Sequence, residues 1–401
     1  MSAQSQNRSR RDEQLCLALA RRTGTEAKDW FPVFKARYGM RVAFDAIRAW
    51  RGDGTVLTQL FTCCTAVDPI IASGLVPRYA DVDRDTVSLD AQRLELDRFE
   101  DLRTVMLQHT FGLIDGEFSR DLTLQTHAAG ALIMEDCAHC VTRMARDEQG
   151  EPLADISIHS FGVEKILPTR FGGAVWVNPH LADSDPHLNS ELRATLRALP
   201  QPNGRLNLVT KLYVNENRVF SRLGDLGRAL RRGFTRIGLY EPPIAPSEQA
   251  GGLKYQPMTS TAWIDAKALA ALRHLDVNES SRQEIVDIYR QRLRGVQGLF
   301  IPASVNDGEA QPLLRFPLFA EDTAIADRLI DAVRGVGGYA ERWYRPELFP
   351  GVTDERAYHL HELDRATVSV SDDLVSRALC LPTEVSKETA AAICDVIVQT
   401  L

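Results

Sequence analysis

The chain has 401 residues, of which 44% are hydrophobic and 25% charged, and its formal net charge is −7. This mix is typical of a globular protein with one or two cores, and it excludes collagen-like, disulfide-framework and wholly disordered chains. The acidic balance argues against a nucleic-acid-binding protein, because neutralising phosphate requires a positive field. Seven cysteines, an odd and sparse number, predict reduced thiols.

The first twelve residues are polar and arginine-rich, and we expect them to be disordered. No apolar segment of a secretory signal follows them, and no apolar run approaches the roughly 18 residues of a membrane span. We therefore expect a cytoplasmic protein that binds neither a membrane nor nucleic acid.

Short β-rich runs alternate with helix-like stretches between about residues 53 and 178, which is the pattern of parallel strands joined by helical crossovers. An amphipathic segment at 41–50 is expected to pack on this sheet. The expected helices are 64–74, 118–129 and 138–146, and the expected strands are 55–61, 77–82, 103–109, 131–135, 155–161 and 174–177.

Residues 180–255 have a different character, because prolines and asparagines interrupt them around one arginine-rich helix at about 215–234. We interpret this stretch as an excursion and linker. A new helical pattern begins near Thr259 and continues behind the capping-box pattern Ser281 to Glu284.

The last part of the chain returns to β-rich sequence at 313–319, followed by a helix at 322–335 and a terminal helix capped by Ser386. We expect a large domain over residues 13–250 and a smaller α+β domain over residues 251–401.

Lysine is scarce, with seven lysines against 40 arginines, and Lys165 stands out for its apolar neighbours Val163, Ile166 and Leu167. It follows an expected strand directly. Burial would disfavour the ammonium, lower its pKa and yield a nucleophilic amine that forms an imine with an aldehyde. The alternative is a loop lysine whose charged end reaches water.

Asp136 follows the apolar run 131–134 at the carboxyl edge of the expected sheet, where open α/β folds bind ligands. A carboxylate there can keep a pyridine nitrogen protonated, or it can cap a helix that starts at Cys137. His139, one helical turn further on, can bond the same ligand or serve a structural role.

Two cysteine pairs, Cys137 with Cys140 and Cys63 with Cys64, raise the possibilities of a redox motif or a zinc half-site. Zinc would need a second pair at matching spacing, and small apolar packing is the simpler interpretation. We expect no metal.

Glycines and a serine flank the lysine segment. Gly172 and Gly173 follow Lys165 closely, so the loop between them can fold beneath a phosphate or another chain. Ser160 precedes the lysine, and Gly39 opens the first amphipathic helix, where free backbone N–H groups favour an anion. Neither a dinucleotide fingerprint, a P-loop nor a nucleophile elbow is present.

These segments, in this order and at these separations, resemble the DegT/DnrJ/EryC1/StrS family of pyridoxal-phosphate-dependent sugar aminotransferases. The resemblance runs, with gaps, from about Tyr38 to the C-terminus. The segments that carry it are 61–66, 74–83, 109–112, 135–139, 160–165 and 171–176.

The resemblance implies a homodimer with the aspartate aminotransferase fold, in which a large α/β domain with a mostly parallel sheet binds pyridoxal 5′-phosphate (PLP) beside a smaller α+β domain. It implies that Lys165 holds the cofactor as an imine, that Asp136 contacts the pyridine nitrogen and that Ser160 contacts the phosphate. His139 would lie near the ring hydroxyl, and Gly39 would belong to the phosphate-binding turn.

The sequence also departs from the family pattern. Met40 replaces a phosphate-binding threonine, and Cys63 replaces an aromatic residue that commonly stacks on the ring. Residues 255–257 replace an Asn-x-Arg sequence whose asparagine reaches the phosphate of the neighbouring subunit. We hypothesise that Arg41 or Arg170 compensates as a phosphate partner.

The activity implied by the resemblance is transfer of an amino group from an amino acid, with glutamate as the expected donor, to a keto group of a nucleotide-activated deoxysugar. Lys165 would also be the general base, and Asp136 would keep the ring nitrogen charged. The alternatives are another reaction on a related sugar, a non-sugar cyclic ketone as acceptor, and a PLP-fold protein that has lost efficient catalysis and acts as a regulator. The lysine argues against the family's dehydratases, which typically have histidine there.

Overall fold

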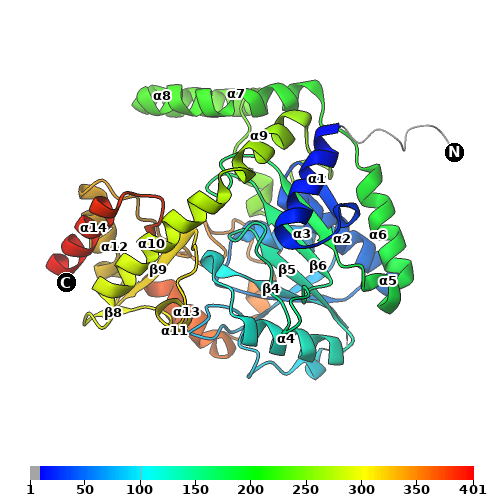
Figure 1. Cartoon of the computed structure of the whole chain (residues 1–401), viewed down its shortest axis with the longest axis horizontal. Coiled ribbons are helices and arrows are strands. Elements are labelled where there is room, and N and C mark those ends of the chain that lie inside the picture. The colour runs from blue at the N-terminus through cyan, green and yellow to red at the C-terminus, as the bar shows by residue number, and fades with distance from the viewer. Residues whose placement is uncertain (1–9, 100) are drawn as a thin grey trace.

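The computed structural model describes residues 10–99 and 101–401 (Figure 1). Its centre is a seven-stranded sheet in the order β1-β7-β6-β5-β4-β2-β3. Strands β2 to β6 are parallel, whereas β7 is antiparallel to both β6 and β1, so the expected mostly parallel α/β sheet is confirmed. The strands are β1 (Trp30–Val33), β2 (Thr55–Gln59), β3 (Val76–Ala80), β4 (Leu102–Gln108), β5 (Leu132–Cys137), β6 (Ile156–Ser160) and β7 (Gly173–Val177).

Helices cover both faces of this sheet, because successive side chains of its central strands point to opposite sides. Met106 and Met134 pack with α2, α3 and α6, while Val105, Leu107 and Ile133 pack on the side of α4. The helices of this part are α2 (Ala36–Arg51), α3 (Cys64–Ser73), α4 (Gly116–Ala128), α5 (Leu181–Ser184) and α6 (Pro186–Ala198).

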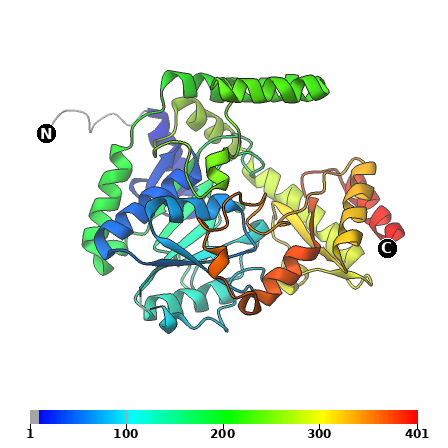
Figure 2. The same cartoon turned by 180° about the vertical axis from the view of Figure 1, so that it is seen from behind.

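A second, smaller sheet follows in the chain, and it is antiparallel with the order β10-β9-β8. Figure 2 shows it from behind, beside the helices near the C-terminus. Ser386 caps the last helix by accepting a hydrogen bond from the backbone N–H of Thr389, as expected. The elements are β8 (Leu299–Phe300), β9 (Arg315–Ala320), β10 (Ala378–Pro382), α9 (Ala262–Leu272), α10 (Leu275–Leu293), α11 (Ala303–Asn306), α12 (Thr323–Gly335), α13 (Ser369–Arg377) and α14 (Lys387–Thr400).

Residues 180–255 hold more structure than the expected linker with one helix. After α6, the helices α7 (Gly204–Arg222) and α8 (Gly224–Arg236) form an antiparallel hairpin. The rings of Phe220 and Phe234 pack between the two helices with their centroids 5.5 Å apart, and Gly224 turns the chain with a φ of 52°. Figures 1 and 2 show the hairpin along one edge of the molecule, projecting beyond the rest.

The helix expected at 138–146 is wrong. Side chains take the backbone N–H groups there: Thr142 donates to Nδ1 of His159, and Ala145 donates to a carboxylate oxygen of Glu135. The segment therefore consists of turns rather than a helix, since these bonds replace those of a helix.

Two further expectations are corrected near helix starts. Ser281 and Glu284 lie inside α10, which begins at Leu275, so they form no capping box. The N-terminal helix α1 begins at Arg10 and packs on α9, so residues 10–12 are helical rather than disordered. Residues 1–9 of that expectation lie outside the described residues. In the described part of the chain, no helix is both long and apolar enough to cross a membrane.

Gly39 tests how closely α2 packs on the sheet. A Cβ atom at Gly39 would lie 2.3 Å from Cγ2 of Val175, which is fully buried in β7. We expect Gly39→Ala to lower the free energy of unfolding by about 1–3 kcal/mol through overpacking, as measured by urea denaturation. Gly233→Ala on α8 is the matched control, because a Cβ there meets nothing within 4 Å. It should be neutral or stabilise the protein by up to ~1 kcal/mol, and equal losses in both variants would contradict this account.

Candidate active site

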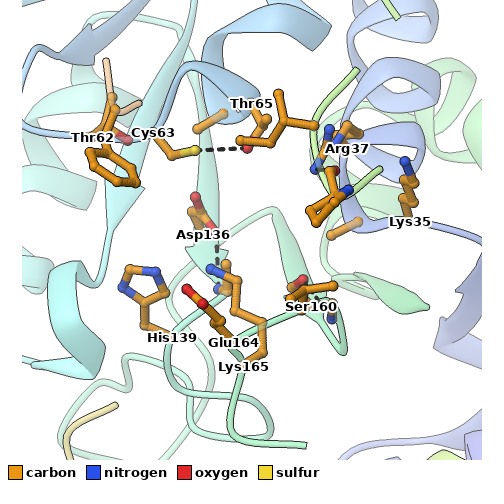
Figure 3. Close-up of a pocket in the computed structure, with 18 of the residues that line it drawn as sticks. Lys35, Arg37, Thr62, Cys63, Thr65, Asp136, His139, Ser160, Glu164 and Lys165 are labelled. Carbon is orange, nitrogen blue, oxygen red and sulfur yellow. Dashed lines mark hydrogen bonds between the residues drawn. The ribbon is translucent and has the colours of Figure 1, made fainter. Parts of the chain in front are cut away.

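A cavity of about 290 Å³ lies at the edge of the sheet where the carboxyl ends of β4, β5 and β6 meet. Gln108, Asp136 and Ser160 lie at or near those ends and line the cavity, as parallel neighbouring strands require. The N-terminal turn of α2 and the aromatic pair at 343–344 complete the lining. Figure 3 shows this cavity.

Lys165 reaches the cavity from the loop between β6 and β7. Its Nζ lies 5.9 Å from the centre of the Trp343 ring, and within the described part of the chain Nζ has no hydrogen-bond or ion-pair partner. Burial lowers the pKa of Lys165, while the neighbouring Cys63, Asp136 and Glu164 act in the opposite direction. The lysine therefore presents an amine that no direct bond occupies.

Asp136 lies in the same cavity, near the end of β5, and is 5% exposed. Its Oδ1 accepts a hydrogen bond of 2.9 Å from the backbone N–H of Ala138, which fixes the carboxylate. Burial raises the pKa of Asp136, against the opposing effects of that N–H, Lys165 and His109. A cationic group placed against the carboxylate would favour its ionised form.

A buried pair of opposite charge lies beside Asp136. Oε1 of Glu135 accepts hydrogen bonds of 2.8 Å from Nε2 of His109 and 2.6 Å from the backbone N–H of Ala145, and Ser157 donates to Oε2. Burial opposes both charges, yet the net pKa of His109 is raised and that of Glu135 is lowered, because each stabilises the charge of the other. The two members of this pair act in opposite directions on Asp136, because His109 lowers the pKa of that carboxyl and Glu135 raises it.

His139 is neutral in this site and its tautomer is defined by its partners. Nδ1 accepts a 3.0 Å bond from the backbone N–H of Phe111, so Nε2 carries the proton and donates to the hydroxyl of Tyr344 at 3.1 Å. Burial, together with Lys165, lowers the pKa of His139 well below its usual value. The ring stacks on Trp343 with the centroids 5.3 Å apart and 11° between the planes.

Two cations mark the opposite side of the cavity, at the N-terminus of α2. Nζ of Lys35 lies 3.2 Å from Glu241, and Nη1 of Arg37 lies 2.7 Å from Glu248, both of whose side chains are fully buried. Burial lowers the pKa of Lys35, against the opposite effects of Glu248 and Glu241. Ser160 faces this end (Figure 3). A helix N-terminus with two cations and a hydroxyl favours an anion.

Of the remaining expected residues, two line the cavity and two do not. Met40 and Arg170 line the cavity. Gly39 packs against β7 and lies outside the lining, and its expected place beside a phosphate stays a prediction. Arg41 also lies outside the lining, and it pairs with Asp45 at 2.7 Å along α2.

The two cysteine pairs differ in exposure. Cys63 lines the cavity at the N-terminus of α3, and its Sγ lies 3.1 Å from Oγ1 of Thr65. Cys137 and Cys140 are buried, and their sulfurs and a ring nitrogen of His109 lie within 4.8 Å of one another. Nε2 of His109 is bonded to Glu135, and three ligands fall short of the four of a structural zinc site.

The sequence pattern of the DegT/DnrJ/EryC1/StrS aminotransferase family matches residues 34–191 and 261–398, which include the whole strand edge that forms the cavity. The chain belongs to this family. Residues 192–260, with the α7 and α8 hairpin, lie between the matched segments.

Individual relatives are distant. The L-glutamine:2-deoxy-scyllo-inosose aminotransferase of Streptomyces kanamyceticus is 26% identical over 217 residues, which cover 50% of this chain and 49% of that protein. The chain thus spans about half the length of that relative. The dTDP-4-amino-4,6-dideoxy-D-glucose transaminase of Shigella dysenteriae is 22% identical over 361 residues, covering 89% and 81%.

A solved structure of NtdA from Bacillus subtilis, with the bound cofactor PMP, matches with a TM-score of 0.68 at 14% identity, over 98% of this chain and 78% of that one. This likeness shows that the family member described here has the same fold.

Sequence reasoning placed Lys165, Asp136, His139 and Ser160 together, and the structure brings these four residues into one cavity. Their chemical roles stay predictions. It missed Lys35, although that residue also follows an apolar run, Trp30 to Phe34, and so carried the signal that singled out Lys165.

Other omissions concern distant segments. The sequence gave no indication that Trp343 and Tyr344 would pack on His139, or that Glu241 and Glu248 would pair with cations of α2. These contacts join residues more than 200 positions apart, and no local spacing encodes them.

Cys63 should be the most reactive thiol of this aminotransferase family member. Hydrogen bonding from Cys64 lowers the pKa of Cys63 to about 6, with further contributions from Thr65 and Lys165 that offset burial. The other six cysteines are buried. We expect substoichiometric iodoacetamide at pH 7 to label Cys63 first, with a rate that falls below about pH 6 as the thiolate is protonated. Peptide mapping that finds another cysteine labelled first, or a fast phase that persists in Cys63→Ser, would contradict this assignment.

Proposed function

We propose that this protein is a PLP-dependent aminotransferase that moves an amino group from an amino acid to a keto group of a nucleotide-activated deoxysugar. The observation that carries the proposal is the unoccupied Lys165 amine beside the buried Asp136 carboxylate in one cavity of a chain with this family membership. A transaminase of Shigella dysenteriae that is named for a dTDP-linked amino sugar supports the substrate class.

The residues present fit PLP by their chemistry. Lys165 offers an amine for an aldehyde, and Asp136 offers a carboxylate for a ring nitrogen. On the opposite side, Ser160, Lys35 and Arg37 at the start of α2 offer donors for a phosphate (Figure 3). When bound, PLP supplies an electron sink that stabilises negative charge on the substrate carbon.

Lys165 performs the proton transfer in this proposal. Burial lowers the pKa of its amine, so that more of the amine is unprotonated near neutral pH and able to accept a proton. Asp136 holds a proton on the ring nitrogen, and its bond to the N–H of Ala138 keeps the carboxylate aimed into the cavity. His139, clamped by Phe111 and Tyr344, presents a fixed neutral ring beside them.

The aromatic residue missing at position 63 has a replacement in this proposal. Trp343 and Tyr344 line the same cavity and stack on His139, so these rings provide apolar surface that a cysteine cannot.

A second candidate acceptor is a non-sugar cyclic ketone. The relative from Streptomyces kanamyceticus supports this candidate, because its name specifies amination of 2-deoxy-scyllo-inosose with L-glutamine. That name also makes glutamine, besides glutamate, an amino donor to be tested.

The expected homodimer and cytoplasmic location remain part of the proposal. The α7 and α8 hairpin exposes several large apolar side chains, which a second copy of the chain would cover. Sedimentation of a monomer at working concentrations would contradict the dimer. The exposed apolar residues of the hairpin include Leu208, Leu212, Val214, Val219, Leu223 and Leu226.

The seven free thiols support the proposed cytoplasmic location, because thiols stay reduced in a reducing compartment.

Borohydride reduction of the PLP-loaded protein tests which lysine carries the cofactor. We expect the cofactor to become fixed to Lys165, and not to Lys35, which lines the same cavity but is bonded to Glu241. Peptide mass mapping identifies the labelled lysine. Lys165→Ala should abolish the label while Lys267→Ala, an exposed lysine outside the cavity, should leave it unchanged. A label on Lys35, or no uptake of PLP, would contradict the proposed role.

Asp136→Asn tests the electrostatic role of the carboxylate. The variant should still take up PLP but transaminate about a hundredfold more slowly or worse, because an amide cannot hold a proton on the ring nitrogen. Asp45→Asn, the same change on the exposed side of α2, should alter the rate less than about twofold. Similar rates in the two variants would exclude the role assigned to Asp136.

A further inference from the structure

A second cavity, of about 740 Å³, lies beside the first. The α7 and α8 hairpin forms one side of it, and the loop that carries Lys165 forms the other. The two cavities are adjacent, because four residues line both of them: Val163, Glu164, Arg170 and Pro243. A long substrate can therefore extend from the Lys165 amine into the second cavity.

The second cavity is strongly cationic. Arg170, Arg231, Arg232 and Arg236 line it, and Glu164 is the one acidic side chain of its lining among the described residues. In the described part of the chain, none of these arginines has an ion-pair partner within 4.0 Å. The cavity thus holds an excess of positive charge that its own walls do not neutralise.

The guanidinium of Arg231 packs near two aromatic rings, and its buried Nε lacks a hydrogen-bond acceptor among the described residues. Its guanidinium carbon lies 5.7 Å from the centre of the Tyr240 ring and 6.0 Å from that of Phe220, while its buried Nε has no hydrogen-bond partner in the described structure. An arginine that packs near two rings and has an unpaired buried Nε is prepared for an anionic acceptor.

The hairpin arginines belong to the segment that the family pattern omits, because residues 192–260 lie between its two matches. Three of the four arginines, Arg231, Arg232 and Arg236, therefore lie outside the matched elements that carry Lys165 and Asp136. Such a segment can determine which acceptor reaches a common catalytic cavity.

We propose that the second cavity binds the diphosphate of a nucleoside-diphosphate-linked keto sugar, with the sugar extending past Glu164 and Arg170 to Lys165. This inference rests on the proposed function and selects the nucleotide sugar over the uncharged cyclic ketone. A diphosphate offers several anionic oxygens, which suit the forked donors of clustered guanidinium groups better than a single carboxylate does.

Calorimetric titration of the full-length, PLP-loaded protein with UDP and dTDP tests the inference, with uridine and thymidine as uncharged probes. At low salt the diphosphates should bind at least about tenfold more tightly than the nucleosides, and added salt should weaken only the diphosphates. The variant Arg231→Gln/Arg232→Gln/Arg236→Gln should lose this preference. If that variant does not fold, Arg232→Gln/Arg236→Gln serves, because both side chains are exposed.

The matched control is Arg218→Gln/Arg222→Gln/Arg228→Gln, which removes the same charge from exposed positions of the hairpin that do not line the cavity. It should change UDP affinity less than about twofold, as distant charges are screened. Equal weakening by both triple variants would overturn the inference, as would a wild-type protein that binds UDP no better than uridine.

The amino-donor reaction separates this inference from the proposed function. The triple variant of the cavity should still accept an amino group from glutamate or glutamine at the wild-type rate, because the donor needs no diphosphate site. Impairment of that step, with glutamate displacing UDP, would assign the arginines to the donor and overturn the inference alone. Protein that binds UDP through these arginines but takes up no PLP would contradict the proposed function and leave the binding site standing.

Discussion

The site depends on placing an amine and a carboxylate together in a cavity that shields both from water. Parallel neighbouring strands impose this arrangement, because β4, β5 and β6 end at one edge and the loops after them converge there. Burial raises the pKa of Asp136 and lowers that of Lys165, so each group by itself is pushed toward its neutral form. A bound group that is cationic against the carboxylate and covalent to the amine relieves both costs.

The fixed charges around the cavity follow from the same constraint. Three buried cations near the cavity each have a glutamate partner. His109 pairs with Glu135 behind the strand ends, and Lys35 and Arg37 each pair with a buried glutamate at the start of α2. One cation lies near the ring-nitrogen side and two lie on the phosphate side of the proposed cofactor site. The cavity is thereby polarised before any ligand enters, which is what electrostatic preorganisation requires.

The sequence predicted much of the sheet and the residues at its carboxyl edge, because strand periodicity and strand order are local signals. It failed where side chains override local propensity: turns replace the expected helix at 138–146, since Glu135 and His159 take its backbone N–H groups. It also failed at contacts across the fold, such as Trp343 on His139. Gly39 shows a third limit, because nothing in the sequence indicated that this glycine packs closely against Val175 of β7. The spacing of residues in a sequence indicates proximity, but not which partner a residue serves.

The measurement that tests the central claim most directly is the absorbance spectrum of the PLP-loaded protein when an amino donor is added without an acceptor. Glutamate or glutamine should convert the bound cofactor to its amine form, with loss of the yellow absorbance, and a keto sugar linked to a nucleoside diphosphate should restore it. A spectrum that stays unchanged with both donors while PLP remains bound would contradict the account.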